Sequence, residues 1–268
     1  MHKFSLALFA SLLLTSIAGA RNGKIDQSPW RMSRSLDVIY DRIAEDVKEG
    51  RPLILAGYYG MWHVNESKPE RNLNWGVYYG HATMLKRAPR DPHIRKLYAN
   101  VRWTKVFEER QAEGPIRTLV FRHRVSPNSR WKSAGVTQPF VVYLVMQAFA
   151  RQEDAGIQMT MNLRQGRGRH IHLDDGTYLD VGKAQVTGYF GHNFFYDYEG
   201  FNWPGLANIK GTPERPKGYF SIGCNTGRVP GFPDLIGPNV SAVLLSRSFM
   251  ASEGYSTLAL ADGILRHF

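Results

Sequence analysis

The sequence predicts an α/β fold in which apolar strands alternate with helices and are covered on both faces. Residues 140–149, FVVYLVMQAF, form a nearly continuous run of β-branched and aromatic side chains, which is typical of a strand buried on both faces. A helical segment and shorter apolar runs follow it along the chain. This order of strand, helix and further strands indicates the α/β class.

The N-terminal half supplies one helix and two strands. Apolar residues recur at helical spacing from Leu36 to Val47, and Gly50 ends the segment, so we expect a helix over 35–49. The run RPLILAGYY (51–59) predicts a buried strand, and IRTLVFRHRV (116–125) predicts a second.

The C-terminal half has clearer signals. A helix is expected over 150–166, where Gly166 ends it, and Asp175-Gly176 suits the tight turn of a hairpin over 170–181. Prolines predict a loop over 199–217. The remaining expected elements are strands at 184–192, 218–223 and 241–247 and a covering helix within 249–265.

The N-terminus has the layout of a signal peptide over residues 1–20. Lys3 is followed by a short apolar run and by the small residues Ala18 to Ala20. The expected location is therefore periplasmic or secreted, with no membrane anchor after cleavage. The rest divides into an aromatic-rich α/β region at 21–134 and a second α/β region at 135–268. These two regions are also compatible with one continuous domain.

The chain is basic, with a formal net charge of +11. Such a charge can favour nucleic acid, anionic lipid or an acidic polymer. Here the Lys and Arg residues are scattered and form no long block. The sequence therefore predicts no nucleic-acid partner.

His192 and Cys224 are the candidate catalytic residues. Each follows a glycine at the end of an apolar strand, and Cys224 is the only cysteine, so it has no intramolecular disulfide partner. Catalytic residues of α/β sheets usually lie beyond the carboxyl ends of strands. A histidine beside a cysteine can hold it as the nucleophilic thiolate, and the Cys224 backbone N–H could face a developing oxyanion.

A strand ending in Gly-His, followed by one ending in Gly-Cys, resembles the caspase, gingipain and clostripain group of cysteine peptidases (clan CD). The segment CNTG at 224–227, with the apolar segment after it, is also similar to the bacterial CHAT branch. The resemblance covers roughly 140–265 and implies a caspase-like three-layer sandwich, with Cys224 as nucleophile and His192 as general acid/base. The family usually has glycine after the histidine, whereas this chain has Asn193.

Other patterns suggest different sites. His170, His172, Asp174 and Asp175 could hold a metal, although the same residues make an ordinary exposed hairpin. His63, Glu66 and His81 lie among tyrosines and tryptophans that could line a glycan cleft or simply pack in the core. Asp197, Glu199 and Asp234 lie near the proposed site in sequence and could favour a basic residue in a substrate.

The preferred interpretation is an exported cysteine hydrolase that cleaves a peptide or protein substrate without a cofactor or a metal. Two alternatives stay open. One is a non-catalytic secreted protein that uses the same fold for binding or structure. The other is a hydrolase directed at cell-wall or glycan substrates, which would need two carboxylates facing a cleft.

Overall fold

The computed structural model describes residues 36–61, 73–192, 206, 208–228, 237–246 and 254–267. Residues 33–268 form one compact unit. The predicted signal peptide at 1–20 and the C-terminal Phe268 lie outside the described residues. Among the helices described, none is long and apolar enough to cross a membrane.

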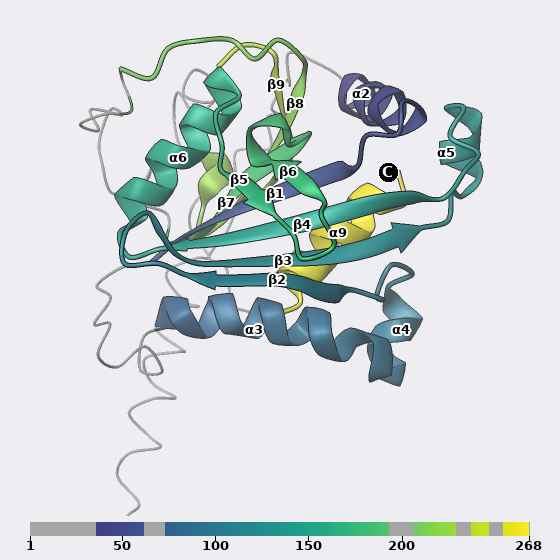
Figure 1. Ribbon diagram of the computed structural model, residues 1–268, viewed down its shortest axis with the longest axis horizontal. Helices are drawn as coiled ribbons and strands as arrows, with labels where there is room; N and C mark the ends of the chain where they lie inside the picture. The colour runs from purple at the N-terminus through teal and green to yellow at the C-terminus, as the bar shows by residue number, and fades with distance from the viewer. Residues whose placement is uncertain are drawn as a thin grey trace, which may run out of the picture. The chain divides into compact units, whose positions relative to one another are not determined.

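The sheet and its helices follow the α/β pattern that the sequence predicts (Figure 1). The helices are α2 (Asp37–Lys48), α3 (Leu73–Arg87), α4 (Pro92–Leu97), α5 (Ser129–Ser133), α6 (Gln152–Gln165) and α9 (Ser256–Leu265). The strands are β1 (Leu53–Gly60), β2 (Thr104–Arg110), β3 (Pro115–Val125), β4 (Phe140–Phe149), β5 (His170–His172), β6 (Tyr178–Asp180), β7 (Val186–Gly191), β8 (Lys217–Ile222) and β9 (Val240–Leu245).

Seven strands form the main sheet in the order β2-β3-β4-β1-β7-β8-β9. The strands β4, β1, β7, β8 and β9 are parallel, and β2 and β3 add to one side as antiparallel strands. Strands from both predicted regions, 21–134 and 135–268, join this sheet. The predicted mostly parallel sheet is confirmed.

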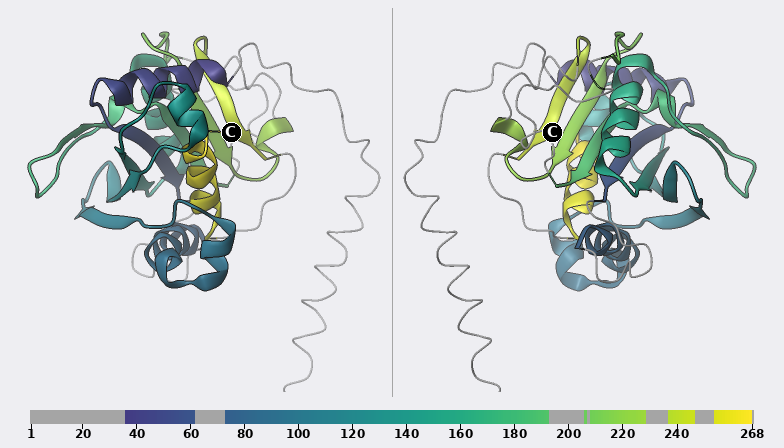
Figure 2. Two further views of the ribbon diagram at one scale, coloured as in Figure 1. Left: turned by 90° about the vertical axis from the view of Figure 1, so that its right-hand side faces the viewer. Right: turned by 90° about the vertical axis from the view of Figure 1, so that its left-hand side faces the viewer.

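Helices cover both faces of the sheet, so the fold is a three-layer α/β sandwich (Figure 2). The side chains of β1 alternate between two cores: Leu55 and Tyr59 pack with α2, α3 and α9, whereas Ile54 and Tyr58 pack with α6. Every residue of β1 is buried. This burial on both faces explains why β1 and β4 are continuous apolar runs rather than alternating patterns.

Local signals explain where several elements end. Gly166 adopts a left-handed conformation with φ 63° directly after α6, and Gly176 does so with φ 81° in the β5–β6 turn. Residues other than glycine rarely adopt this backbone conformation. At the start of α4, the Asp91 carboxylate accepts hydrogen bonds from the backbone of His93 and Ile94.

The sequence analysis predicted neither the edge strand β2 nor the helices α3, α4 and α5. Helix α3 buries Tyr78, Ala82 and Leu85, whose helical spacing is a signal that could have identified it. The edge strand β2 is charged and largely exposed, as edge strands often are, so its sequence lacks a buried-strand pattern.

Candidate functional site

The strands that precede the two candidate catalytic residues are neighbours in the sheet. β7 and β8 are parallel, and Phe190 pairs with Ile222 across them. The same offset of 32 residues separates His192 from Cys224. Because carboxyl ends of parallel strands meet at one edge of a sheet, His192 and Cys224 follow the strands at the same edge. Both residues are half-buried.

This edge lies beside the point where the order of the strands reverses. The chain passes from β1 to β4 on one side of β1, and then to β7 on the other side (Figure 1). The last paired residues of β1 and β7 are Gly60 and Gly191. In open α/β sheets, ligands bind outside the carboxyl ends of the strands at such a reversal. The position of His192 therefore agrees with that of a ligand site.

Close packing holds the backbone before His192. Gly191 has φ 143°, and a Cβ atom there would lie 2.8 Å from the Gly60 carbonyl oxygen and 2.9 Å from the Tyr189 hydroxyl. The Tyr189 hydroxyl donates a hydrogen bond to the His192 carbonyl oxygen at 3.0 Å. Burial raises the pKa of Tyr189 well above its ordinary value, so its hydroxyl stays a neutral donor. Glycine at 191 is thus required by both space and conformation.

The turn that carries Cys224 is tied to the end of β9. The Ser246 hydroxyl donates to the Gly223 carbonyl oxygen. Thr226 donates through its hydroxyl to the Ser221 carbonyl oxygen at 3.0 Å and accepts from the Ser246 backbone N–H at 3.0 Å. Asn225 has φ 55°, a left-handed conformation that asparagine tolerates better than most residues. These bonds fix the backbone on both sides of Cys224.

Buried aromatic residues support the same edge from one face of the sheet. Tyr59 stacks on Phe190 with ring centroids 4.5 Å apart. His81 contacts Phe190 edge-on, and its Nδ1 atom lies 2.7 Å from the Thr257 hydroxyl and 2.9 Å from that of Tyr59. His81 is only 1% exposed. The sequence left open whether this aromatic segment lines a glycan cleft or packs in the core, and His81 packs in the core.

Two of the other candidate sites rest partly or wholly on residues that the structure does not describe. His63 and Glu66 of the aromatic segment lie outside the described residues. So do Asn193, Asp197, Glu199 and Asp234 of the predicted site region.

The histidine hairpin is the exposed ribbon β5–β6. His170 and His172 are exposed and flank the Tyr178 ring, with centroids 5.4 and 5.0 Å away. Asp175 binds Arg122 and the Thr177 backbone. Within the described ranges, no group of three or more His, Cys, Asp or Glu residues is arranged to hold a metal ion.

Sequence reasoning missed the residues that position the two strand ends, namely Tyr189, Thr226 and Ser246. Tyr189 lies two residues before Gly191, but no local sequence pattern indicates that its hydroxyl donates to the His192 carbonyl oxygen. Ser246 contacts Gly223 only because β8 and β9 are neighbours. No sequence signal identifies that contact.

Comparison of the chain with protein-family models, with curated proteins and with solved structures finds no match. The arrangement of His192 and Cys224 therefore carries the functional argument on its own.

Proposed function

We propose that this protein is an exported cysteine hydrolase of the caspase-like peptidase type, with Cys224 as the nucleophile and His192 as the general acid/base. One observation supports the proposal above all. Two residues that are 32 positions apart follow adjacent parallel strands at one edge of the sheet, beside the reversal of strand order. A histidine and the only cysteine of the chain are the pair of residue types that this chemistry needs.

The proposed reaction has two steps. The Cys224 thiolate attacks the carbonyl carbon of a peptide bond, and the resulting tetrahedral oxyanion receives hydrogen bonds from backbone N–H groups of the turn. When the C–N bond breaks, protonated His192 gives its proton to the leaving amine, and a thioester remains on Cys224. His192 then takes a proton from water as the water attacks the thioester, which releases the carboxylic acid and the thiolate.

Export is the second part of the proposal, and it rests on residues 1–20. Cleavage after Ala20 predicts Arg21 as the first residue of the exported chain. N-terminal sequencing of exported material tests this, and a retained Met1 contradicts it.

Alkylation by iodoacetamide tests the dyad. An ordinary cysteine, with a pKa near 8.5, is only a few per cent thiolate at neutral pH. We expect native Cys224 to be alkylated at neutral pH about tenfold faster than an ordinary cysteine. The His192→Ala variant should lose most of this increase in rate. His170→Ala is the matched control, because His170 is an exposed histidine on the β5–β6 hairpin.

The outcomes separate the enzyme from the alternatives. Coincident pH profiles for wild type and His192→Ala exclude activation of Cys224 by His192. Labelling that becomes fast only in denaturant identifies a structural thiol and favours the non-catalytic alternative. Loss of peptide hydrolysis in a folded Cys224→Ala variant supports the peptidase.

A further inference from the structure

A pocket lies at the opposite edge of the sheet from His192 and Cys224. It has a volume of about 680 Å³ and is reached from the amino ends of β1, β7 and β8, where Ile54, Gln185 and Lys217 line it. A strand rises about 3.3 Å per residue, so the length of β8 separates this pocket from Cys224 by roughly 20 Å. The pocket is therefore a separate site.

Lys217 is a buried amine that donates hydrogen bonds to uncharged groups. Only 3% of the residue is exposed. Its Nζ atom donates to the Asn162 side-chain oxygen at 2.8 Å and to the Gly182 carbonyl oxygen at 2.7 Å. Both acceptors are uncharged. An ammonium has three donors and these acceptors use two of them, and Lys217 lines the pocket.

Burial makes the ammonium form of Lys217 unfavourable. Burial and the nearby Arg42 lower the pKa of Lys217 to about 7, and Asp180 opposes this only in part. An anion in the pocket would favour the charged form. Binding of an anion should therefore be coupled to uptake of a proton by Lys217.

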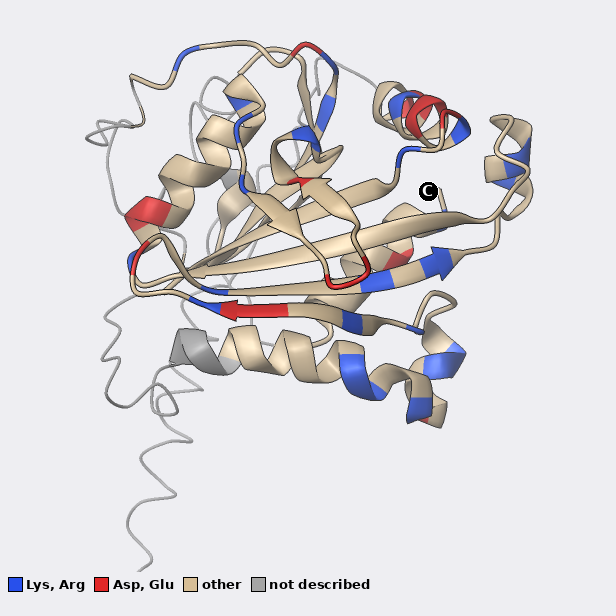
Figure 3. Ribbon diagram, viewed as in Figure 1, with Lys and Arg blue, Asp and Glu red and all other residues tan. Residues whose placement is uncertain are grey.

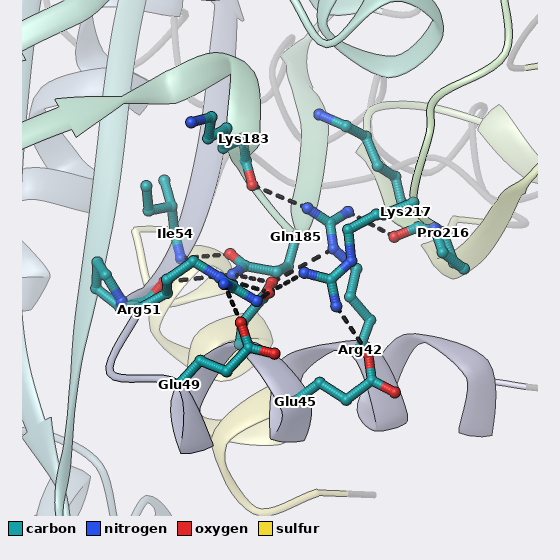
Figure 4. A network of polar contacts seen from close by, with 12 residues as sticks. Arg42, Glu45, Glu49, Arg51, Ile54, Lys183, Gln185, Pro216 and Lys217 are labelled. Carbon is teal, nitrogen blue, oxygen red and sulfur yellow. Dashed lines mark hydrogen bonds and ion pairs between the residues drawn. The ribbon is translucent and has the colours of Figure 1, made fainter.

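Three arginines share one buried carboxylate at the wall of the pocket (Figure 4). Asp46 accepts from Arg51 and Arg215 and lies 3.5 Å from the Arg42 Nε atom. Arg42 also donates to the carbonyl oxygens of Pro216 at 2.5 Å and Lys183 at 3.0 Å. This buried carboxylate balances only one of the three guanidinium charges.

The other balancing acids are exposed. Glu49 pairs with Arg51, and Glu45 pairs with Arg215; both glutamate side chains are more than half exposed. Ion pairs between exposed side chains contribute little free energy, so a ligand can replace them. The titratable and charged residues that line the pocket are Arg42, Asp46, Arg51, Tyr178, Asp180, Lys183, Glu214, Arg215 and Lys217.

The lining has five basic and three acidic residues, a surplus that suits a dianion. Figure 3 shows the Lys and Arg residues spread over many elements, so this concentration around a cavity is a local feature. Its volume lies in the range of pockets that bind small molecules. We propose that this pocket binds a phosphate group, held by Lys217 from within and by Arg51 and Arg215 at the mouth.

Titration calorimetry with inorganic sulfate tests the proposal, because sulfate remains a dianion over the whole pH range used. If only protonated Lys217 supports binding, the apparent affinity at about pH 8.5 should be about thirtyfold lower than at about pH 6. Lys217→Met should lower the affinity at pH 6 by about tenfold or more. Lys132→Met removes an exposed lysine from α5 and should bind like the wild type.

A second variant keeps the test decisive if Lys217→Met does not fold. Arg215→Gln removes a partly exposed donor at the mouth and should lower sulfate affinity severalfold. Wild-type protein that shows no saturable binding of sulfate or phosphate overturns the proposal. Equal affinity of wild type and Lys217→Met, or of wild type and Arg215→Gln, also overturns it.

Inorganic phosphate and glucose 6-phosphate identify the source of the phosphate group. Tighter binding of glucose 6-phosphate supports a phosphorylated small molecule as the ligand, since the cavity is larger than one phosphate. Binding of inorganic phosphate with equal or higher affinity supports the free ion. In both cases Lys217→Met should weaken binding as it does with sulfate, whereas the pH dependence is read from sulfate alone because phosphate groups change their own charge between about pH 6 and about pH 7.

Discussion

At the carboxyl ends of β7 and β8, glycines and hydrogen bonds between uncharged groups hold the chain, whereas at the amino ends of the same strands buried charges hold it. Gly191, Tyr189 and Ser246 fix one edge. Asp46, Arg42 and Lys217 fix the other. The carboxyl edge should therefore respond to changes in volume, and the amino edge to changes in charge and pH.

This difference matters for the two proposals. A nucleophile and its base need a backbone that holds both residues in one geometry over the whole reaction. A site that recognises an anion needs charge that its own residues only partly neutralise. The two proposals place these sites at opposite ends of the same strands, roughly 20 Å apart.

The largest expected effect on stability is at Asp46. Asp46→Asn leaves the buried Arg42 without a carboxylate partner, and breaking a buried ion pair costs about 3–5 kcal/mol. Urea unfolding at neutral pH measures this loss. Glu49→Gln, a change at an exposed pair, should alter stability by less than about 0.5 kcal/mol. Equal stabilities of the two variants would contradict the assigned role of Asp46.

The effect of Asp46 should also depend on pH. Burial alone raises the pKa of Asp46, but hydrogen bonds from Gln185 and Arg51 and the nearby Arg42 and Arg215 lower it overall from 3.8. A lowered pKa in the folded state stabilises the fold above the unfolded value, and this stabilisation is lost as the pH falls below it. The difference between wild type and Asp46→Asn should shrink under those acid conditions.

Gly60→Val tests the packing of the carboxyl edge. A Cβ atom at Gly60 would overlap the Tyr189 hydroxyl and lie 2.9 Å from the Gln152 Cα atom. Because the backbone at Gln152 cannot move aside easily, we expect a loss of about 3 kcal/mol in the free energy of unfolding, independent of pH. Gly80→Ala is the control, since its nearest neighbour would lie at 3.7 Å. A stable Gly60→Val variant would show that this edge is loosely packed.

Lys217 should make stability rise with pH. Burial lowers its pKa in the folded state to about 7, below the ordinary lysine pKa of 10.5, so the unfolded chain binds more protons between these values. The free energy of unfolding should then gain about 2 kcal/mol between about pH 7 and about pH 9 from this group. Lys217→Met should lose this rise, whereas Lys132→Met should keep it. An unchanged slope in Lys217→Met would assign the pH dependence to other residues.

Tyr189→Phe should have the smallest effect. It removes the hydrogen bond to the His192 carbonyl oxygen, which is expected to contribute about 1 kcal/mol. We expect slower alkylation of Cys224 as His192 becomes less well positioned, measured beside the exposed Tyr178→Phe as control. Identical alkylation rates in both variants would remove the positioning role of Tyr189 while leaving the dyad itself untouched.

Local sequence signals determined much of the fold. The strand over 140–149 was predicted with its observed bounds, and the end of α6 at Gly166 and the turn at Gly176 follow from glycine conformations. The order of His192 and Cys224 after their strands is equally a property of the sequence. These features depend on residues a few positions apart, so the side chains and backbone conformations at those positions are enough to predict them.

Only the tertiary structure decided which segments are neighbours. It placed β1 between β4 and β7, brought β7 beside β8, and gathered Asp46, Arg215 and Lys217 around one pocket. The sequence alone assigned Lys217 to the end of a predicted loop, whereas it begins β8, and it gave the charge of Lys217 no role. The physical reason is that strand pairing and charge networks join residues more than a hundred positions apart, and burial over the whole sheet selects them rather than any local propensity.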